Sequence, residues 1–175
     1  MYNKMDNENK VLRFFFDNPT EKFHIRAIAR ALKLNPNTIL NIISKLEKKG
    51  LLIRKKKNHI VEVSADVNDD FKRMKRIDNL KRLYESNIIH FLEKEFNPNS
   101  ISVIGSYSTG EDIENSDIDI VIISNKNKHK EVNLKKFEKI LFRRIHLIVT
   151  DYSISEEFYI NLINGIVLYG YIDKK

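Results

Sequence analysis

The feature that most constrains the fold is a pair of β-rich runs joined by a polar, acidic loop. The runs are SISVIGS at residues 100–106 and SDIDIVIIS at residues 116–124. The first run ends in Gly105 and Ser106, where glycine lets the backbone approach a phosphate closely. In the second, strand alternation puts Asp117 and Asp119 on one face, where they repel each other and lose hydration. A cation would remove that cost. Mg²⁺ suits the position because it prefers carboxylate and phosphate oxygens.

The spacing within this segment is itself a motif. Gly105-Ser106, ten further residues and then Asp117-x-Asp119 match the signature GSx10DxD. The chain therefore resembles the DNA polymerase β-like nucleotidyltransferase superfamily, and within it the minimal nucleotidyltransferase proteins of prokaryotes. The resemblance covers residues 80–175, down to the ending INGIVLYG, which looks like the final helix and strand of that family. A solvated Asp-x-Asp pair beside a tight turn is the plain structural alternative.

The resemblance implies a specific chemistry. The residues that would hold or line the nucleotide phosphates are Gly105, Ser106, Tyr107 and Ser108. Asp117 and Asp119 would ligate one or two Mg²⁺ or Mn²⁺ ions that orient a nucleoside triphosphate, with ATP the expected one. A nucleoside monophosphate would pass to a protein or small-molecule hydroxyl as pyrophosphate leaves. In the minimal subgroup the acceptor can be a tyrosine on a partner toxin of the HEPN class, which would make the protein part of a toxin–antitoxin pair.

One position departs from the family pattern. The superfamily usually carries a third carboxylate on a later strand, and the matching segment here, RRIHLIVTD, has His146 at that position. Imidazole is a poor Mg²⁺ ligand, although it suits Mn²⁺ better and can act as a general base. Three interpretations remain open. The two aspartates suffice and His146 assists or stands aside, the site binds nucleotide with little or no transfer, or Asp151 completes the metal site. Strand alternation puts Asp151 on the face opposite His146, which disfavours the third.

Charge is distributed unevenly along the 175 residues, whose formal net charge is +7. Residues 1–65 hold 14 Lys and Arg against 6 Asp and Glu, a balance of +8, whereas residues 98–175 hold 10 against 11. A basic N-terminal third indicates a nucleic-acid-binding module joined to a second domain, with a lysine-rich solvated surface as the alternative.

Composition excludes several classes of protein and site. The chain has no cysteine, which excludes disulfides, thiolate metal sites and a cysteine nucleophile. No apolar run approaches the length of a membrane span, and the polar first residues do not resemble a signal peptide. We therefore expect no membrane partner and a cytoplasmic location.

Three helices and a ribbon are predicted in the N-terminal third. The helical segments are NENKVLRFFFDNP, FHIRAIARALKL and NPNTILNIISKLEKKG. In the third, Asn35 can cap the helix, Pro36 suits its first turn and Gly50 suits its end. Two β-rich runs that flank KKKN then predict a two-stranded ribbon with a basic tip.

This order of elements resembles the winged helix-turn-helix of bacterial and archaeal transcription regulators, over roughly residues 5–65. The resemblance implies that residues 36–49 form the recognition helix and that the ribbon is the wing. The residues expected to contact double-stranded DNA are Asn37, Thr38, Asn41, Lys45 and Lys48 on the helix, and Arg54, Lys55, Lys56, Lys57 and His59 on the wing. Such readers often pair half-sites, which favours a homodimer. A protein–protein module is the alternative.

The predicted fold class is α+β, in three parts. They are a winged helix-turn-helix domain at 1–66, a helical connector at 67–97 and a mixed α/β nucleotidyltransferase-like domain at 98–175. The connector reads as one long helix or two abutting ones, with His90 on a solvated or satisfied helix face and no chemical role. The acidic loop residues Glu111, Asp112 and Glu114 are also expected in solvent. Two functions remain open: an NMP-transferring enzyme that binds DNA, or a DNA-binding regulator whose second domain senses nucleotide or mediates association.

Overall fold

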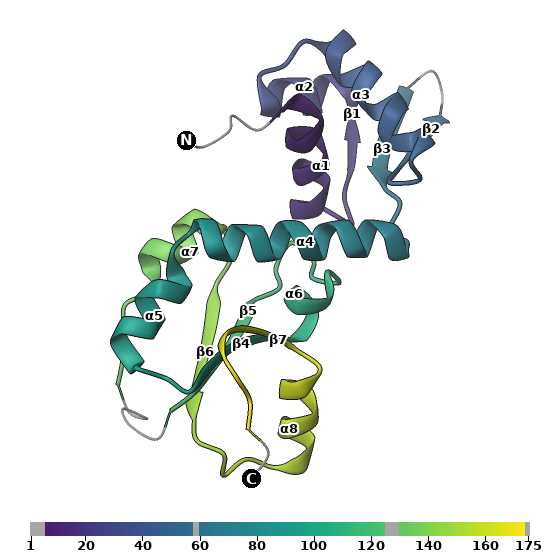
Figure 1. Cartoon of the computed structure of the whole chain (residues 1–175). Coiled ribbons are helices and arrows are strands. Elements are labelled where there is room, and N and C mark those ends of the chain that lie inside the picture. Colours follow the sequence, from purple (N-terminus) through teal and green to yellow (C-terminus); the bar gives the residue numbers. More distant parts are fainter. Residues whose placement is uncertain (1–5, 58–59, 125–129, 174–175) are drawn as a thin grey trace. The chain divides into compact units, whose positions relative to one another are not determined.

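Two compact units make up the computed structural model, which describes residues 6–57, 60–124 and 130–173. The units are Met1–Lys75 and Arg76–Lys175, and the division falls inside helix α4 (Asp69–Glu85). Figure 1 shows the order of the elements along the chain. Within the described ranges, every helix is too short or too polar to cross a membrane.

The first unit combines three helices with a small antiparallel sheet. The helices are α1 (Asn7–Asp17), α2 (Ile25–Leu32) and α3 (Pro36–Lys48). The strands are β1 (Lys22–His24), β2 (Leu52–Lys57) and β3 (Ile60–Ala65), in the order β1-β3-β2. The three predicted helices and the predicted ribbon are all present.

Strand β1 is a correction, because the sequence pattern places two of its residues, Phe23 and His24, at the start of the second helix. Phe23 pairs with Val63 of β3, and its ring centroid lies 4.6 Å from that of Phe14. The apolar contact of the partly buried Phe23 and its pairing with β3 stabilise the strand more than extending α2 by one residue would stabilise the helix. The helix therefore begins later than predicted, at Ile25.

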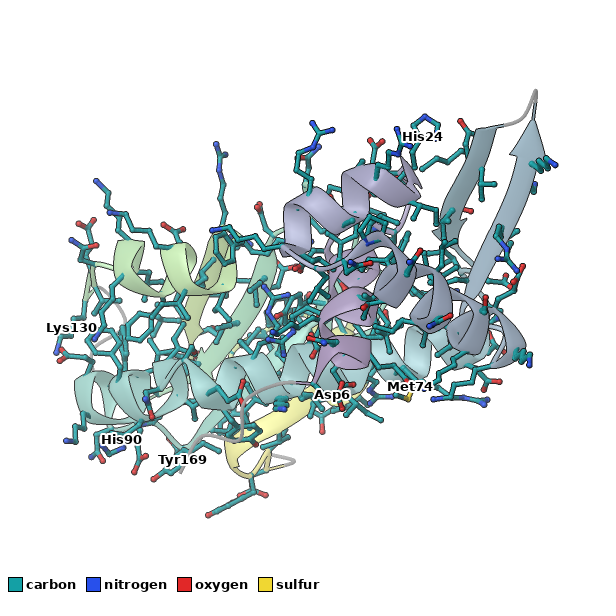
Figure 2. The ribbon with its side chains drawn as sticks, turned by 90° about the horizontal axis from the view of Figure 1, so that it is seen from above. Asp6, His24, Met74, His90, Lys130 and Tyr169 are labelled. Atoms are coloured by element: carbon teal, nitrogen blue, oxygen red, sulfur yellow. The ribbon has the colours of Figure 1, made fainter. Side chains whose placement is uncertain are left out.

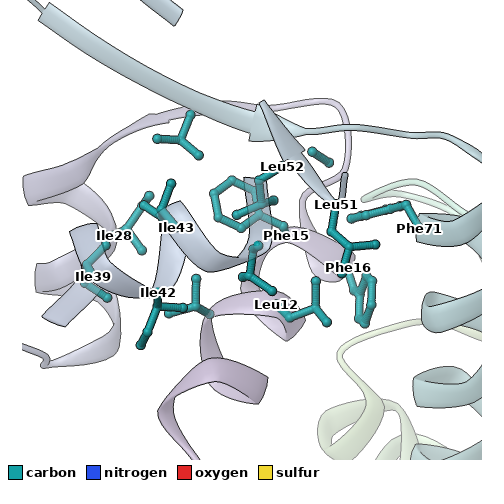
Figure 3. Close-up of a cluster of buried hydrophobic side chains, with 14 of the residues drawn as sticks. Leu12, Phe15, Phe16, Ile28, Ile39, Ile42, Ile43, Leu51, Leu52 and Phe71 are labelled. Atoms are coloured by element: carbon teal, nitrogen blue, oxygen red, sulfur yellow. The ribbon is translucent and has the colours of Figure 1, made fainter. Parts of the chain in front are cut away.

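The core of the first unit follows the apolar periodicity of its helices (Figure 3). On α3, the buried face consists of Ile39, Ile42, Ile43 and Leu46. Phe71 of α4 belongs to the same core, with its ring 5.0 Å from that of Phe16. The predicted cap of α3 is present: the backbone N–H of Asn37 donates to Oδ1 of Asn35 at 2.8 Å. Because the apolar face of α3 is buried in this core, the polar face of the helix is turned outward.

The second unit is built around a mixed four-stranded sheet in the order β6-β5-β4-β7. Its strands are β4 (Ser100–Ile104), β5 (Ile118–Ile123), β6 (Ile145–Thr150) and β7 (Ile166–Gly170). Its further helices are α5 (Ile88–Phe96), α6 (Gly105–Thr109), α7 (Lys135–Leu141) and α8 (Glu156–Ile163). Strands β5 and β6 run parallel, whereas β4 pairs antiparallel with β5 and with β7.

Both faces of this sheet are covered. Ile118, Ile120 and Ile122 of β5 join a core that includes residues of α5 and α7. Val121 and Ile123 point the other way and pack in a second core with Leu162 of α8. The continuous apolar run of β5 is explained by this burial on both sides.

The connector consists of two abutting helices, α4 and α5, rather than one long helix. Asn87 separates α4 from α5 with a left-handed backbone, φ 62°. The hydroxyl of Ser86 accepts the N–H of Ile88 at 3.2 Å and so helps to start the second helix. The side chain of His90, labelled in Figure 2, is 62% exposed, and its Nδ1 lies 3.6 Å from Oε2 of Glu93, which agrees with the predicted solvated or satisfied face.

Candidate functional site

The chain turns sharply where β4 ends, and the turn brings Gly105 against Asp119. Ile104, the last residue of β4, pairs with Asp119 in the antiparallel register. Gly105 then adopts a left-handed backbone with φ 68°. A Cβ atom at this position would lie only 2.9 Å from Oδ2 of Asp119. Glycine is therefore required twice, by the backbone conformation and by the carboxylate beside it.

The predicted nucleotide-binding residues of α6 differ in exposure. The side chains of Tyr107 and Ser108 are buried, and Oγ of Ser108 donates to the carbonyl of Gly105 at 2.7 Å. Burial, partly offset by the nearby Arg82 charge, raises the pKa of the Tyr107 hydroxyl. These two side chains support the turn rather than line it. Gly105, which is exposed, and Ser106, which is half-buried, remain within reach of a ligand.

Asp119 lies at the start of β5, and Asp117 directly precedes the strand. Ile118 and Ile120 are fully buried, so strand alternation directs the two aspartates to the opposite face. Asp117 is exposed, and the Asp119 side chain is 34% exposed. Two carboxylates are therefore accessible beside the turn at Gly105.

His146 reaches the site through the parallel pairing of β5 with β6. In that register it lies next to Asp119, and its Nδ1 is 2.9 Å from Oδ1 of Asp119. The imidazole side chain is 61% exposed. His146, which the resemblance aligns with the family's third carboxylate, therefore contacts the second aspartate of the motif directly.

Asp117, Asp119 and His146 fit a metal site in which the protein supplies only some of the ligands. Two carboxylates suit Mg²⁺, which keeps several water and phosphate oxygens among its ligands, and the imidazole suits Mn²⁺ better. Across the described part of the chain, no group of three or more His, Cys, Asp or Glu side chains is arranged to hold an ion. The two aspartates could hold a cation whose remaining ligands come from a bound nucleotide.

Asp151 is not brought to this site. It follows Thr150, which pairs with Ile123 at the far end of β5. Asp151 lies five positions beyond His146, which is roughly 16 Å along an extended strand. Oδ1 of Asp151 accepts the N–H of Ser153 at 2.8 Å instead. The interpretation in which Asp151 completes the metal site is therefore wrong.

Asp112 is a second correction, because it is buried rather than solvated. It is 2% exposed, and its Oδ1 accepts from Nδ2 of Asn79 at 2.8 Å. Its Oδ2 lies 4.0 Å from Nη2 of Arg143, and Asn79 also donates to the carbonyl of Tyr107 at 3.0 Å. One carboxylate thus ties α4 and α6 to the segment before β6. No local pattern distinguishes Asp112 from its acidic neighbours in the loop.

A cavity of about 470 Å³ opens beside Asp117. Its lining residues are Glu114, Asn115, Ser116, Asp117, Phe142, Arg143 and Arg144. The last three come from the turn between α7 and β6. Sequence patterns do not single them out, since they reach Asp117 only through the pairing of β5 with β6.

The predicted DNA-contacting residues of the first unit are placed as follows. On α3, Thr38 is half-buried and the exposed residues are Asn37, Asn41, Lys45 and Lys48. On β2, Lys55 and Lys56 are exposed. Nη2 of Arg54 lies 2.7 Å from Oε2 of Glu47, so that charge is already paired. For Lys57 the structure describes only the backbone, and His59 lies outside the described residues.

Comparisons with known proteins place the second unit in a family. Residues 86–173 match the family model described as Polymerase beta, Nucleotidyltransferase. No curated protein matches the chain.

Three solved structures are similar to the chain at low identity. A possible transcriptional regulator from Methanosarcina mazei Go1 is 18% identical over 52% of this chain and 78% of its own, with a TM-score of 0.37. A mutant of ZitR from Lactococcus lactis is 13% identical over 55% of this chain and 65% of its own, with a TM-score of 0.39. A candidate nucleotidyltransferase from Sulfolobus solfataricus is 19% identical over 54% of this chain and 83% of its own, with a TM-score of 0.35.

Proposed function

Because the chain belongs to the polymerase beta nucleotidyltransferase family, we propose that its second unit transfers a nucleoside monophosphate from a nucleoside triphosphate to a hydroxyl group. The observation that supports this most is the packing of the Asp119 carboxylate against Gly105. A phosphate held at the turn would lie beside both aspartates of the motif. We take ATP as the expected nucleotide.

In this proposal the chain's own residues bind and orient the nucleotide. The backbone of Gly105 and the hydroxyl of Ser106 contact phosphate oxygens, while Asp117 and Asp119 hold a divalent cation, Mg²⁺ or Mn²⁺. When bound, such a cation neutralises phosphate charge and polarises the bond that breaks. The acceptor is a hydroxyl of a protein or a small molecule. A tyrosine on a HEPN-type partner is the first one to try.

The contact between His146 and Asp119 supports a second candidate function. It occupies one oxygen of a metal-binding carboxylate at the position where the family supplies a further acid. A site built in this way would bind nucleotide and metal with little transfer. The second unit would then be a nucleotide sensor or an association module of a DNA-binding regulator.

A transfer assay tests the first candidate against the second. The protein is incubated with α-labelled ATP, Mg²⁺ or Mn²⁺, and candidate acceptors. Transfer that disappears in Asp117→Asn and Asp119→Asn, but persists in the exposed control Asp173→Asn, supports the enzyme. Metal-dependent ATP binding without transfer supports the sensor. Transfer that persists in Asp119→Asn would contradict the proposed site.

For the first unit, we propose a winged helix-turn-helix domain that binds double-stranded DNA as a homodimer. Its three helices followed by the ribbon β2–β3 support this proposal, as does the exposed polar face of α3. Lys45 and Lys48 on α3 and Lys55 and Lys56 on β2 would contact phosphates, which gives affinity without sequence preference. Asn37 and Asn41 are the side chains best suited to hydrogen-bond base edges.

Fluorescence anisotropy with a labelled duplex over a range of salt concentrations tests this assignment. The double substitution Lys55→Ala and Lys56→Ala should weaken binding and lower the slope of log affinity against log salt by about one for each lost phosphate contact. Lys94→Ala, an exposed lysine of α5, is the matched control. An unchanged slope in the double variant would contradict the assignment of the wing. Light scattering of the free protein tests the homodimer.

A further inference from the structure

Phe142 occupies a position that is unusual for a phenylalanine. Its side chain is 76% exposed, more than any other large hydrophobic side chain in the described ranges. It also ends α7 with a left-handed backbone, φ 55°, where glycine or asparagine is the usual residue. Neither burial nor backbone preference accounts for an aromatic ring at this position.

The turn that carries Phe142 is fixed on its helical side. Nη2 of Arg82 donates to the carbonyl of Leu141 at 2.8 Å, and Nη1 of Arg143 donates to the carbonyl of Phe142 at 3.2 Å. Arg143 in turn lies next to the buried carboxylate of Asp112. The ring therefore extends from a backbone that is held in place by buried polar groups.

The turn is also tied to the strand that begins at the aspartate pair. Oε1 of Glu138 accepts the N–H of Ile145 at 3.1 Å, at the start of β6. The carbonyl of Arg144 accepts the N–H of Ile118 at 2.9 Å. Because Asp117 directly precedes Ile118, this bond sets the segment from Phe142 to Arg144 beside the first aspartate of the motif.

The cavity between these segments offers a mixed chemistry. Phe142 supplies a flat aromatic face, Asn115 and Ser116 supply an amide and a hydroxyl, and Arg144 supplies a guanidinium. The side chain of Arg144 makes no hydrogen bond or ion pair with any residue that the structure describes. A flat, uncharged ring system with polar atoms along its edge would match this set of groups.

We propose that this cavity is the base subsite of the nucleotide, with the nucleobase stacked on Phe142 and its polar edge facing Asn115, Ser116 and Arg144. The proposal rests on the proposed function, which places the phosphates at Gly105 and Ser106 and the metal at Asp117. With Asp117 in the wall of the cavity, a nucleotide bound at the motif would extend directly into it. Stacking favours the larger purine rings, so ATP and GTP should bind more tightly than CTP and UTP.

Calorimetric titration of the full chain in Mg²⁺ tests the subsite. Phe142→Ala should weaken ATP binding about tenfold, the order expected when one base loses its stacking partner, and should reduce the preference for purines. Phe142→Trp should keep both. Inorganic tripolyphosphate, which has no base, should bind the wild type and Phe142→Ala equally. Tyr171→Ala removes another exposed aromatic ring, 69% exposed, and should change nothing.

Phe142→Gly distinguishes loss of the ring from loss of folding. Glycine suits the left-handed backbone at this position, so this variant should melt at or above the wild-type temperature while it binds ATP as weakly as Phe142→Ala. Unchanged ATP affinity in Phe142→Ala, with tripolyphosphate binding that still depends on Asp119, would overturn the base subsite and leave the proposed function standing. Equal losses of ATP and tripolyphosphate affinity in Phe142→Gly would also overturn it. If the wild type binds neither compound, the proposed function fails, and the subsite fails with it.

Discussion

On one side of the candidate site, the Gly105-Ser106 turn and the aspartate pair are close in the chain and are joined by neighbouring antiparallel strands. On the other side, Phe142, Arg144 and His146 arrive only because β6 pairs in parallel with β5. A parallel pair needs a long connection, so its register cannot be deduced from nearby residues. The side with Gly105 and the two aspartates is thus recorded in a local motif, whereas the side with the imidazole and the aromatic ring depends on tertiary structure.

The largest expected effect comes from Asp112, which links the two sides. Asp112→Ala removes the partner of Asn79 and Arg143 in a buried setting, and should lower the free energy of unfolding by about 3 kcal/mol. Urea denaturation monitored by circular dichroism measures this loss. Glu111→Ala, at the exposed neighbouring position, is the control and should change stability little. Equal stabilities of the two variants would mean that the buried carboxylate does not join the two sides.

Gly105→Ala changes only the side of the site that holds the turn and the two aspartates. The left-handed backbone and the collision with Oδ2 of Asp119 should together cost about 2 kcal/mol and abolish metal-dependent ATP binding. Gly50→Ala is a matched control in the first unit, with the same φ of 68° but no atom nearer to the new Cβ than 3.9 Å. It should cost about 1 kcal/mol and leave ATP binding intact. Intact ATP binding in Gly105→Ala would contradict the role of this turn.

The same contrast explains how much of the structure could be predicted from the sequence. Helix α3 and strand β5 show their periodicity and caps locally, so their positions agree with the pattern. Strand β1 does not, because Phe23 and His24, at the start of the predicted helix, belong to a strand only when β3 is there to pair with them. In the site, spacing predicted that Asp117 and Asp119 share a face. The burial of Asp112 and the position of Phe142 depend on partners distant in the chain.

His146→Asp places a carboxylate on β6, at the position where the resemblance predicts the family's third acid. A third carboxylate beside Asp119 should raise Mg²⁺ affinity about tenfold. Without metal, the clustered carboxylates should repel one another, so the melting temperature should fall in EDTA and rise more steeply with Mg²⁺ than in the wild type. His146→Asn is the control without the added charge. A Mg²⁺ response equal to that of the wild type would mean that this position does not face the metal.

The smallest expected effect distinguishes the roles of Ser106 and Ser108, two serines of α6. Ser108→Ala removes the bond to the Gly105 carbonyl and should lower the free energy of unfolding by about 1 kcal/mol. Ser106→Ala should leave stability nearly unchanged and weaken ATP binding. Thermal melts and calorimetric titration of both variants check this division. If Ser108→Ala lost affinity while Ser106→Ala kept it, the two roles would be reversed.

The central claim is that the second unit of this chain transfers a nucleoside monophosphate from its Gly105–Asp119 site. Intact mass spectrometry of a candidate acceptor, after incubation with the protein, ATP and Mg²⁺, tests it most directly. The acceptor should gain the mass of one nucleoside monophosphate less one water with the wild type and nothing with Asp119→Asn. A gain of a single phosphate, or the same gain with Asp119→Asn, would contradict the claim.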